Sequence, residues 1–196
     1  MIGILAVQGG VEEHENILNA LGLAHKRVKG LKDVEVTEAG ASLSGFIIPG
    51  GESTVMDQFM NKYGLKDWLI QKVKQDPSFV VFGTCAGLIL LARYGLLDVT
   101  VERNAYGRQH ASFEAEVLVE GAGLEGYGDL VSSHQVIPVR GHFIRAPKVT
   151  HVGVLAQVLA EHAGVPVVLK QGRVWGISFH PELAGSSRLH SAVFSC

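Results

Sequence analysis

Nine residues near the middle of the chain combine a strand, a tight turn and a helix start: Phe79-Val80-Val81-Phe82-Gly83-Thr84-Cys85-Ala86-Gly87. The first four are apolar and β-prone, and they are the strongest strand signal in the sequence. The last five have the form Gly-x-nucleophile-x-Gly, with cysteine where hydrolases carry serine. Such a turn puts the thiol at a helix N-terminus, which favours the thiolate. On this pattern alone, a catalytic Cys85 and a buried structural cysteine are equally good interpretations.

Strands and helices alternate on both sides of this stretch. Strands are expected at 2–7, 25–28, 45–48 and 79–82, and helices at 11–21, 53–61, 65–74 and 86–94, with Ser53 as an N-cap. This order is typical of a doubly wound, mostly parallel sheet. The second half predicts shorter, partly antiparallel strands at 99–103, 113–119, 165–171 and 174–179, with a hairpin at Gly172-Arg173. A glycine-rich stretch over 120–142 is expected to be irregular, and a closing helix is expected at 186–194.

Length and composition limit the classes of protein. The 196 residues indicate one domain over 1–196, and 47% hydrophobic residues exclude a disordered chain. Seventeen basic and nineteen acidic residues give a net charge of −2, which argues against nucleic acid or an anionic membrane as the main partner. Two cysteines, Cys85 and Cys196, are too few for a disulfide framework. With no leader or long apolar segment visible, we expect a cytoplasmic protein.

A cysteine nucleophile needs a base, and the base needs a group that orients it. Of nine histidines, most lie by context on the surface or in loops, but His180 follows the strand expected at 174–179. The carboxyl ends of strands are where open α/β sheets carry their sites. In His180-Pro181-Glu182, the carboxylate can reach the imidazole and select its tautomer. A strand-ending turn is the better interpretation of this motif alone, but not when Cys85 is considered with it.

A third motif, Pro49-Gly50-Gly51-Glu52-Ser53-Thr54, also follows a strand. Its glycines allow backbone N–H groups to point into a cavity and stabilise an oxyanion. Phosphate binding at the helix N-terminus is the weaker alternative, because no Gly-Lys-Ser/Thr or Gly-x-Gly-x-x-Gly is present. Metal-binding spacings such as Cys-x-x-Cys are also missing from the sequence, so no metal site is expected.

In this order, the three motifs resemble the class I (triad) glutamine amidotransferases, and within them the glutaminase subunits of pyridoxal 5′-phosphate synthase. The resemblance covers nearly the whole chain. Further matching segments are Gln8-Gly9 and Ser112-Phe113-Glu114. The branch is marked by Glu102-Arg103-Asn104 with Gly107-Arg108-Gln109 and by Phe143-Ile144-Arg145-Ala146-Pro147. The stretch 120–142 is longer than the corresponding family connection, and the chain ends where the family usually continues its last helix.

The resemblance implies a role for each matching residue. Cys85 would be the nucleophile, His180 the general base and acid, and Glu182 the group that orients His180. The backbone N–H groups of Gly51 and Ala86 would form the oxyanion hole. L-Glutamine would be held by the following residues: Gly51, Glu52, Ser53, Arg103, Ile144 and Arg145. A guanidinium suits the substrate carboxylate, although the sequence does not decide between the two arginines.

The resemblance also implies the reaction and the partner. Glutamine would be hydrolysed to glutamate and ammonia without a cofactor, and the ammonia would pass to a synthase subunit, a TIM-barrel ring. That subunit combines ammonia with a pentose phosphate and a triose phosphate. Alternatives are the glutaminase subunit of another amidotransferase, such as imidazole glycerol phosphate synthase, a cysteine peptidase or γ-glutamyl hydrolase on the same sheet, and a flavodoxin-like binding module with an accidental cysteine.

Overall fold

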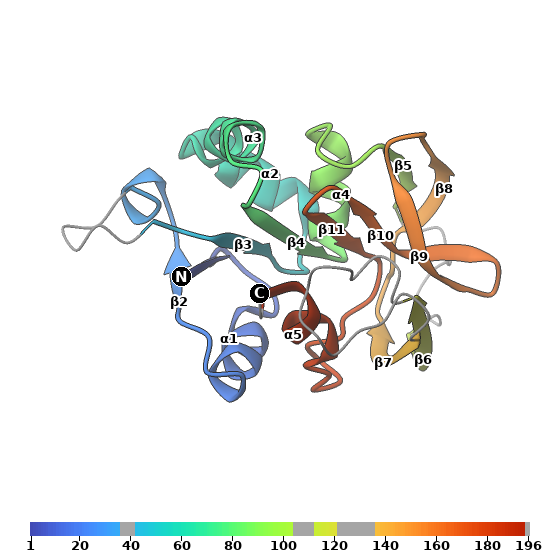
Figure 1. Cartoon of the computed structure of the whole chain (residues 1–196). Helices are drawn as coiled ribbons and strands as arrows, with labels where there is room; N and C mark the ends of the chain where they lie inside the picture. The colour runs from blue at the N-terminus through green and yellow to red at the C-terminus, as the bar shows by residue number, and fades with distance from the viewer. Residues whose placement is uncertain (36–41, 104–111, 121–135, 195–196) are drawn as a thin grey trace.

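A computed structural model describes residues 1–35, 42–103, 112–120 and 136–194, and its centre is a seven-stranded sheet in the order β2-β1-β3-β4-β11-β10-β9 (Figure 1). Its strands are β1 (Ile2–Leu5), β2 (His25–Val28), β3 (Gly45–Ile48), β4 (Val80–Thr84), β9 (Gln157–His162), β10 (Val165–Gln171) and β11 (Val174–Ile177). The first five in the spatial order are parallel, whereas β10 is antiparallel to both β11 and β9. The expected α/β class and mostly parallel sheet are therefore confirmed.

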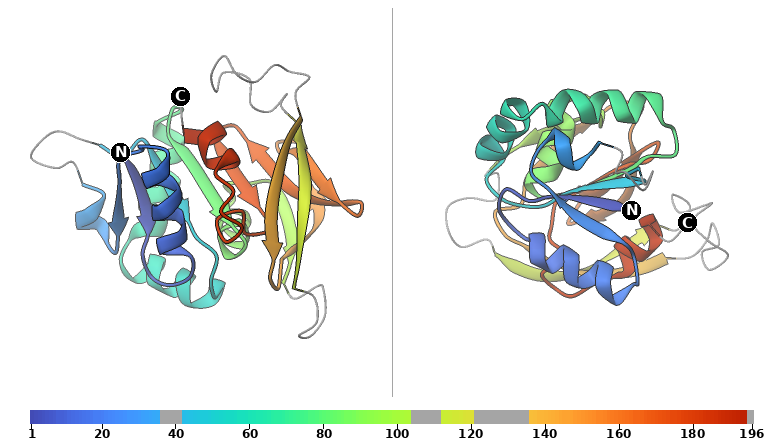
Figure 2. Two further views of the ribbon diagram at one scale, coloured as in Figure 1. Left: turned by 90° about the horizontal axis from the view of Figure 1, so that it is seen from below. Right: turned by 90° about the vertical axis from the view of Figure 1, so that its left-hand side faces the viewer.

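Helices cover both faces of this sheet, so it forms the middle of three layers. One face carries α1 (Val11–Ala20) and α5 (Arg188–Phe194). The other carries α2 (Ser53–Lys62), α3 (Leu65–Gln75) and α4 (Ala86–Arg93), as Figures 1 and 2 show. A single 3-10 turn, η1 (Leu31–Asp33), follows β2.

The central strands are continuous runs of mostly apolar residues, because both faces of these strands are buried. In β3, the fully buried Ile47 joins the core on the α1 and α5 side, while Phe46 and Ile48 join the core under α2, α3 and α4. In β4, Phe82 and Val81 divide between the two cores in the same way. Two closely packed cores therefore fix the carboxyl ends of β3, β4 and β11, where the motifs begin.

Two small antiparallel sheets stand beside the end of the main sheet (Figure 2). One pairs β5 (Val99–Glu102) with β8 (Lys148–Val152), and the other pairs β6 (Phe113–Glu120) with β7 (Val136–Phe143). Phe143, at the end of β7, stacks on Phe113 at 4.6 Å between ring centroids and contacts Phe179 at 4.9 Å. This aromatic cluster holds Ile144 and Arg145 next to the end of β11.

Some local expectations were wrong. The N-cap of α2 is Glu52 rather than Ser53, because the Glu52 carboxylate accepts hydrogen bonds from the backbone N–H groups of Thr54 and Val55. Part of the stretch expected to be irregular, 136–142, belongs to β7, and β8 and β9 were not expected. β7 and β8 pair with β6 and β5, which are distant in sequence, whereas β9 pairs with the adjacent strand β10, which was expected. Residues 121–135 of that stretch lie outside the described ranges. None of the helices in the described part of the chain is long and apolar enough to cross a membrane.

Candidate active site

Cys85 occupies a strained turn between β4 and α4. Its backbone has φ 49° and ψ −99°, a combination that residues other than glycine rarely adopt. The flanking glycines make this turn possible: a Cβ at Gly87 would lie 2.2 Å from the carbonyl oxygen of Ile48, and one at Gly83 would lie 2.8 Å from the carbonyl carbon of Gly87. The expected steric reason for the Gly-x-Cys-x-Gly form therefore agrees with the packing. Cys85 is buried, and its Sγ lies 3.9 Å from the carbonyl oxygen of Ile144.

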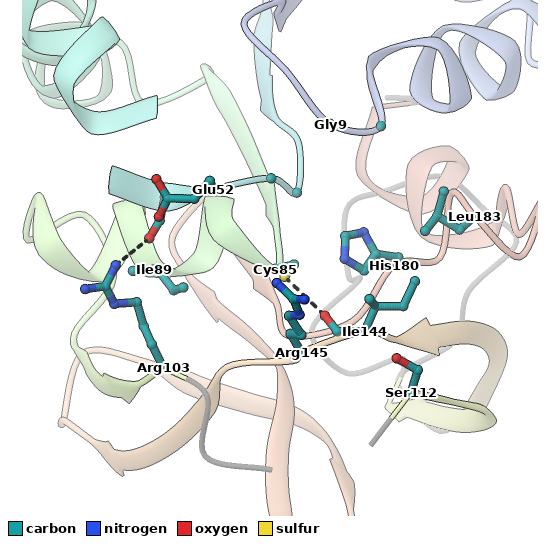
Figure 3. A pocket seen from close by; sticks show the side chains of 14 residues that line it. Gly9, Glu52, Cys85, Ile89, Arg103, Ser112, Ile144, Arg145, His180 and Leu183 are labelled. Atoms are coloured by element: carbon teal, nitrogen blue, oxygen red, sulfur yellow. Dashed lines mark hydrogen bonds between the residues drawn. The ribbon is translucent and has the colours of Figure 1, made fainter. Parts of the chain in front are cut away.

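His180 and Glu182 form a hydrogen-bonded pair just after β11. The Nδ1 atom of His180 lies 2.7 Å from Oε1 of Glu182, and both side chains are buried. The backbone of His180 is fixed by a two-way bridge to His142, with N–O distances of 2.8 and 3.1 Å. Figure 3 shows the imidazole beside Cys85, which comes from the neighbouring strand β4. The structure thus brings together the three residues that the sequence selected.

The electrostatics of this group favour a charged imidazole. Burial alone lowers the pKa of His180, but the hydrogen bonds and charges of Cys85 and Glu182 outweigh burial and raise this pKa to about 10. Burial raises the pKa of Glu182, but His14, His180 and a backbone N–H outweigh it, so this pKa is lowered. The arrangement is suited to an imidazolium that is hydrogen-bonded to a carboxylate.

The loop after β3 packs directly against His180. A Cβ at Gly50 would lie 2.1 Å from Cε1 of the His180 ring, so only glycine leaves space for the imidazole there. Gln8 donates a hydrogen bond from Nε2 to the carbonyl oxygen of Glu52 at 3.0 Å, which ties this loop to the end of β1. The expected oxyanion donors come from this loop, at Gly51, and from the first residue of α4, Ala86. As a first helical residue, Ala86 has an N–H without an intrahelical acceptor.

The residues expected to hold glutamine lie around the same cavity. Arg103 follows β5 and donates hydrogen bonds from Nη1 to the hydroxyl groups of Ser53 and Thr54, both at 3.1 Å. The carboxylate of Glu52 caps α2, and these backbone hydrogen bonds lower its pKa. Arg145 has a strained backbone, with φ 47°. Because it is a second non-glycine residue with positive φ at this cavity, the segment after β7 is also held by its surroundings.

The cavity has a volume of about 590 Å³ and opens at the carboxyl ends of the parallel strands (Figure 3). It is lined by eight residues that the sequence selected: Gly51, Glu52, Ser53, Cys85, Arg103, Ile144, Arg145 and His180. Ala86 and Glu182 are not among its lining residues, and Glu182 lies behind His180. Six further lining residues were not assigned to the site: Gly9, Gly10, Gly50, Ile89, Ser112 and Leu183. Gly9, Gly50 and Ser112 lie within sequence motifs quoted above, and those motifs could have assigned them to the site.

Sequence reasoning missed two buried histidines behind the triad. His14 in α1 and His190 in α5 are both fully buried, although context placed most histidines on the surface. The Nδ1 atom of His14 lies 2.8 Å from Nε2 of His190. The available signal was periodicity, because His14 falls on the apolar face of its helix with Ile17 and Leu18.

The comparisons first define the class of protein. A solved structure described as a glutamine amidotransferase matches with a TM-score of 0.81 at 38% identity, covering 96% of this chain and 94% of that chain. The structure of PurLQS from Thermotoga maritima matches with a TM-score of 0.74 at 13% identity and shares the fold alone. The fold is that of the class I glutamine amidotransferases.

The family follows from the sequence comparisons. The model of the SNO glutamine amidotransferase family matches residues 4–194, and the chain belongs to this family. Relatives include the pyridoxal 5'-phosphate synthase subunit PdxT of Thermus thermophilus, 40% identical over 97% of this chain and 94% of the relative. The subunit of the same name from Streptomyces avermitilis is 41% identical, with 97% and 90% covered.

Proposed function

We propose that this chain is the glutaminase subunit of a pyridoxal 5′-phosphate synthase and hydrolyses L-glutamine to L-glutamate and ammonia. Membership of a glutamine amidotransferase family and the name of its relatives support this proposal. The observation that carries it is the 2.7 Å hydrogen bond between His180 and Glu182 beside Cys85, in one cavity. A nucleophile, a base and an orienting carboxylate are what amide hydrolysis through a thioester requires.

In the first half-reaction, the Cys85 thiolate attacks the carbon of the glutamine side-chain amide. The negative charge that develops on the amide oxygen is met by the N–H groups of Gly51 and Ala86. His180, held as an imidazolium by its neighbours, then donates its proton to the amine nitrogen as the C–N bond breaks. Ammonia leaves, and a γ-glutamyl thioester remains on Cys85.

In the second half-reaction, water attacks the thioester. The now neutral His180 takes a proton from the water, and the tetrahedral intermediate collapses to glutamate with the thiolate as leaving group. Glu182 stays ionised throughout. It keeps the Nδ1 proton of His180 in place, so that Nε2 faces the reacting atoms.

The substrate's charged end is assigned to the rim of the cavity. The guanidinium groups of Arg103 and Arg145 are available for its carboxylate, and the loop of Gly51, Glu52 and Ser53 supplies polar groups around it. Ile144 completes this wall, and its carbonyl oxygen already contacts the nucleophile. Glutamine hydrolysis by these residues requires no cofactor.

The proposal includes a partner and a location. Ammonia is largely protonated at neutral pH and is then no longer a nucleophile, so release is useful only next to an acceptor enzyme. The partner is the synthase subunit of the same complex, for which the family resemblance implies a TIM-barrel ring. A single domain over 1–196 and a cytoplasmic location are part of the same proposal.

The test is glutamate release from L-glutamine by the purified chain, measured with and without the synthase subunit of its own source. We expect release that depends on the synthase, and little release from a γ-glutamyl peptide or L-asparagine. Equal or faster cleavage of the γ-glutamyl peptide would favour the γ-glutamyl hydrolase alternative. No glutamate release under either condition would exclude the proposed function.

A further inference from the structure

A buried chain of polar side chains continues behind Glu182, away from the substrate cavity. The Oε1 atom of Glu182 that binds His180 also lies 3.4 Å from Oγ1 of Thr84 and 3.8 Å from Nε2 of His14. Thr84 and His14 are 3.4 Å apart, and Nδ1 of His14 contacts His190 at 2.8 Å. All of these side chains are buried. This series of polar side chains joins α1, β4 and α5 to the triad, and the reaction described above does not use it.

Two proton arrangements of the histidine pair are possible, and the carboxylate separates them. If His14 donated from Nδ1 to His190, its Nε2 lone pair would face the carboxylate oxygen of Glu182. If His190 donates from Nε2 instead, His14 carries its proton on Nε2 and directs it toward Thr84 and Glu182. Thr84 can then donate its hydroxyl proton to Glu182. In this second arrangement every hydrogen bond is directed toward the negative charge, which strengthens the series.

Burial favours the neutral form of both histidines, in which the pair can donate hydrogen bonds without adding positive charge beside His180. Burial lowers the pKa of His14 and lowers that of His190 to about 3. The other charged groups that act on His14 are Glu182, His180 and Glu13 of its own helix. The Nδ1 atom of His190 has no hydrogen-bond partner among the described residues. An unpartnered buried acceptor nitrogen at this position agrees with a His190 proton on Nε2.

We propose that His14 is a positioning residue for glutamine hydrolysis, which through Thr84 holds the Glu182 carboxylate ionised and correctly oriented toward His180. This inference rests on the proposed function. The competing interpretation is core packing, since the Phe82 ring lies 4.8 Å from the His190 ring and 6.3 Å from the His14 ring between centroids. Packing alone predicts changes in stability without any change in the pH dependence of the reaction.

The test compares His14→Phe, which keeps a ring but removes the donor, with His14→Gln, which restores a donor near the position of Nε2. Without the donor, the ionised form of Glu182 is stabilised less, so its protonation occurs at higher pH. For His14→Phe we expect the acidic limb of kcat against pH, measured in the complex with the synthase, to move upward. At pH 6 kcat should fall about tenfold or more, the effect expected from loss of one hydrogen bond to a charged group. At pH 8 the fall in kcat should be smaller. His14→Gln should recover most of the wild-type profile.

A second readout does not depend on turnover. In a Cys196→Ser background, Cys85 is the single cysteine, and its alkylation by iodoacetamide can be followed against pH. The pH midpoint of the Cys85 alkylation rate should be higher in His14→Phe than in wild type, and it should return toward the wild-type value in His14→Gln. If the wild-type complex released no glutamate, the proposed function would fail, while this alkylation comparison would still decide the role of His14.

Leu18→Ala is the matched control, because Leu18 is fully buried one turn further along α1. It should lower stability and leave both pH profiles unchanged. If His14→Phe does not fold, Thr84→Val removes the intervening hydroxyl at nearly the same volume, and the same upward shifts are expected. Unchanged pH profiles in the variant that folds would overturn the inference and leave His14 and His190 as core residues.

Discussion

At the residue scale, the charge state of His180 depends on Cys85 and Glu182. The backbone strain at Cys85, with φ 49°, aims its thiol toward the cavity, and the imidazole lies against it. Charges at Cys85 and Glu182 raise the pKa of His180 to about 10, against the effect of burial. In the proposed reaction, the acid that protonates the departing ammonia is therefore already charged before glutamine binds. Burial of an imidazole without these partners would have the opposite effect.

The first prediction concerns the nucleophile. Cys85→Ala should abolish glutamine hydrolysis and labelling by a glutamine-mimicking electrophile, because Cys85 is the one thiol among the described residues that line the cavity. Both the fold and synthase binding should be retained, as judged by circular dichroism and co-elution with the synthase. Cys196→Ser is the control and should keep full activity and labelling. More than trace activity in Cys85→Ala would contradict the assignment.

The second prediction separates proton transfer from orientation. His180→Asn should lose nearly all activity, because the imidazole moves a proton in both half-reactions. Glu182→Gln should lose much of the activity but less than His180→Asn, since it only orients and stabilises the imidazole. Steady-state rates of both variants in the complex, measured at saturating glutamine, decide the order. The reverse order would show that the roles have been divided wrongly.

At the element scale, the loop after β3 and the turn after β4 are fixed by close approaches that only glycine permits. The sequence predicted the turn at Cys85 because its pattern is local. It also placed the motif at Gly50, but as a source of conformational freedom. In the structure, Gly50 provides space, because its Cα faces the ring of His180 from a different strand. Such a contact between distant segments has no local sequence pattern.

The third prediction follows from that contact. Gly50→Ala should push the His180 ring out of place and reduce kcat about 100-fold or more, as expected for a catalytic group displaced by about 1 Å. The control is Gly30→Ala, because a Cβ at Gly30 would meet nothing within 4 Å. The control should change neither kcat nor stability appreciably. Wild-type kcat in Gly50→Ala would contradict the close approach of this loop to His180.

The fourth prediction concerns how α5 is held on the sheet. Burial lowers the pKa of His190 to about 3, so the unfolded chain binds a proton that the folded chain does not between about pH 6.5 and pH 3. The free energy of unfolding should therefore fall as the pH falls through this window. In His190→Gln, which keeps a donor toward His14, the slope between pH 6 and pH 4 should be smaller by up to ~1.4 kcal/mol per pH unit.

Urea unfolding at several pH values measures this slope. His151→Gln is the control, because His151 is exposed on β8 and solvated in both states. It should leave the slope unchanged. An equal slope in wild type and His190→Gln would show that His190 is not neutral and buried in the folded chain.

At the scale of the whole molecule, segments that are far apart in sequence meet at one edge of the sheet. Those that follow β3, β4 and β11 could be placed from sequence because the carboxyl ends of parallel strands share an edge. The β7 segment could not be placed this way, since it reaches the site through pairing with β6 and aromatic contacts with Phe179. The resemblance to the family, rather than any local pattern, selected Ile144 and Arg145. The buried contacts of His14 and His190 depend on tertiary packing and were missed.

The steady-state rate of glutamate release, measured with and without saturating synthase, is the decisive test of the proposed glutaminase and of its activation by docking. An oxyanion donor at Gly51 that becomes oriented only on docking would stabilise the transition state rather than the bound substrate. We predict that docking raises kcat about 100-fold to 1,000-fold and changes KM less, the size of effect known for one such donor. A fall in KM at constant kcat would indicate that the partner only completes the substrate pocket. Equal kcat values with and without the synthase would contradict activation by docking, and no glutamate release from the complex would contradict the glutaminase function itself.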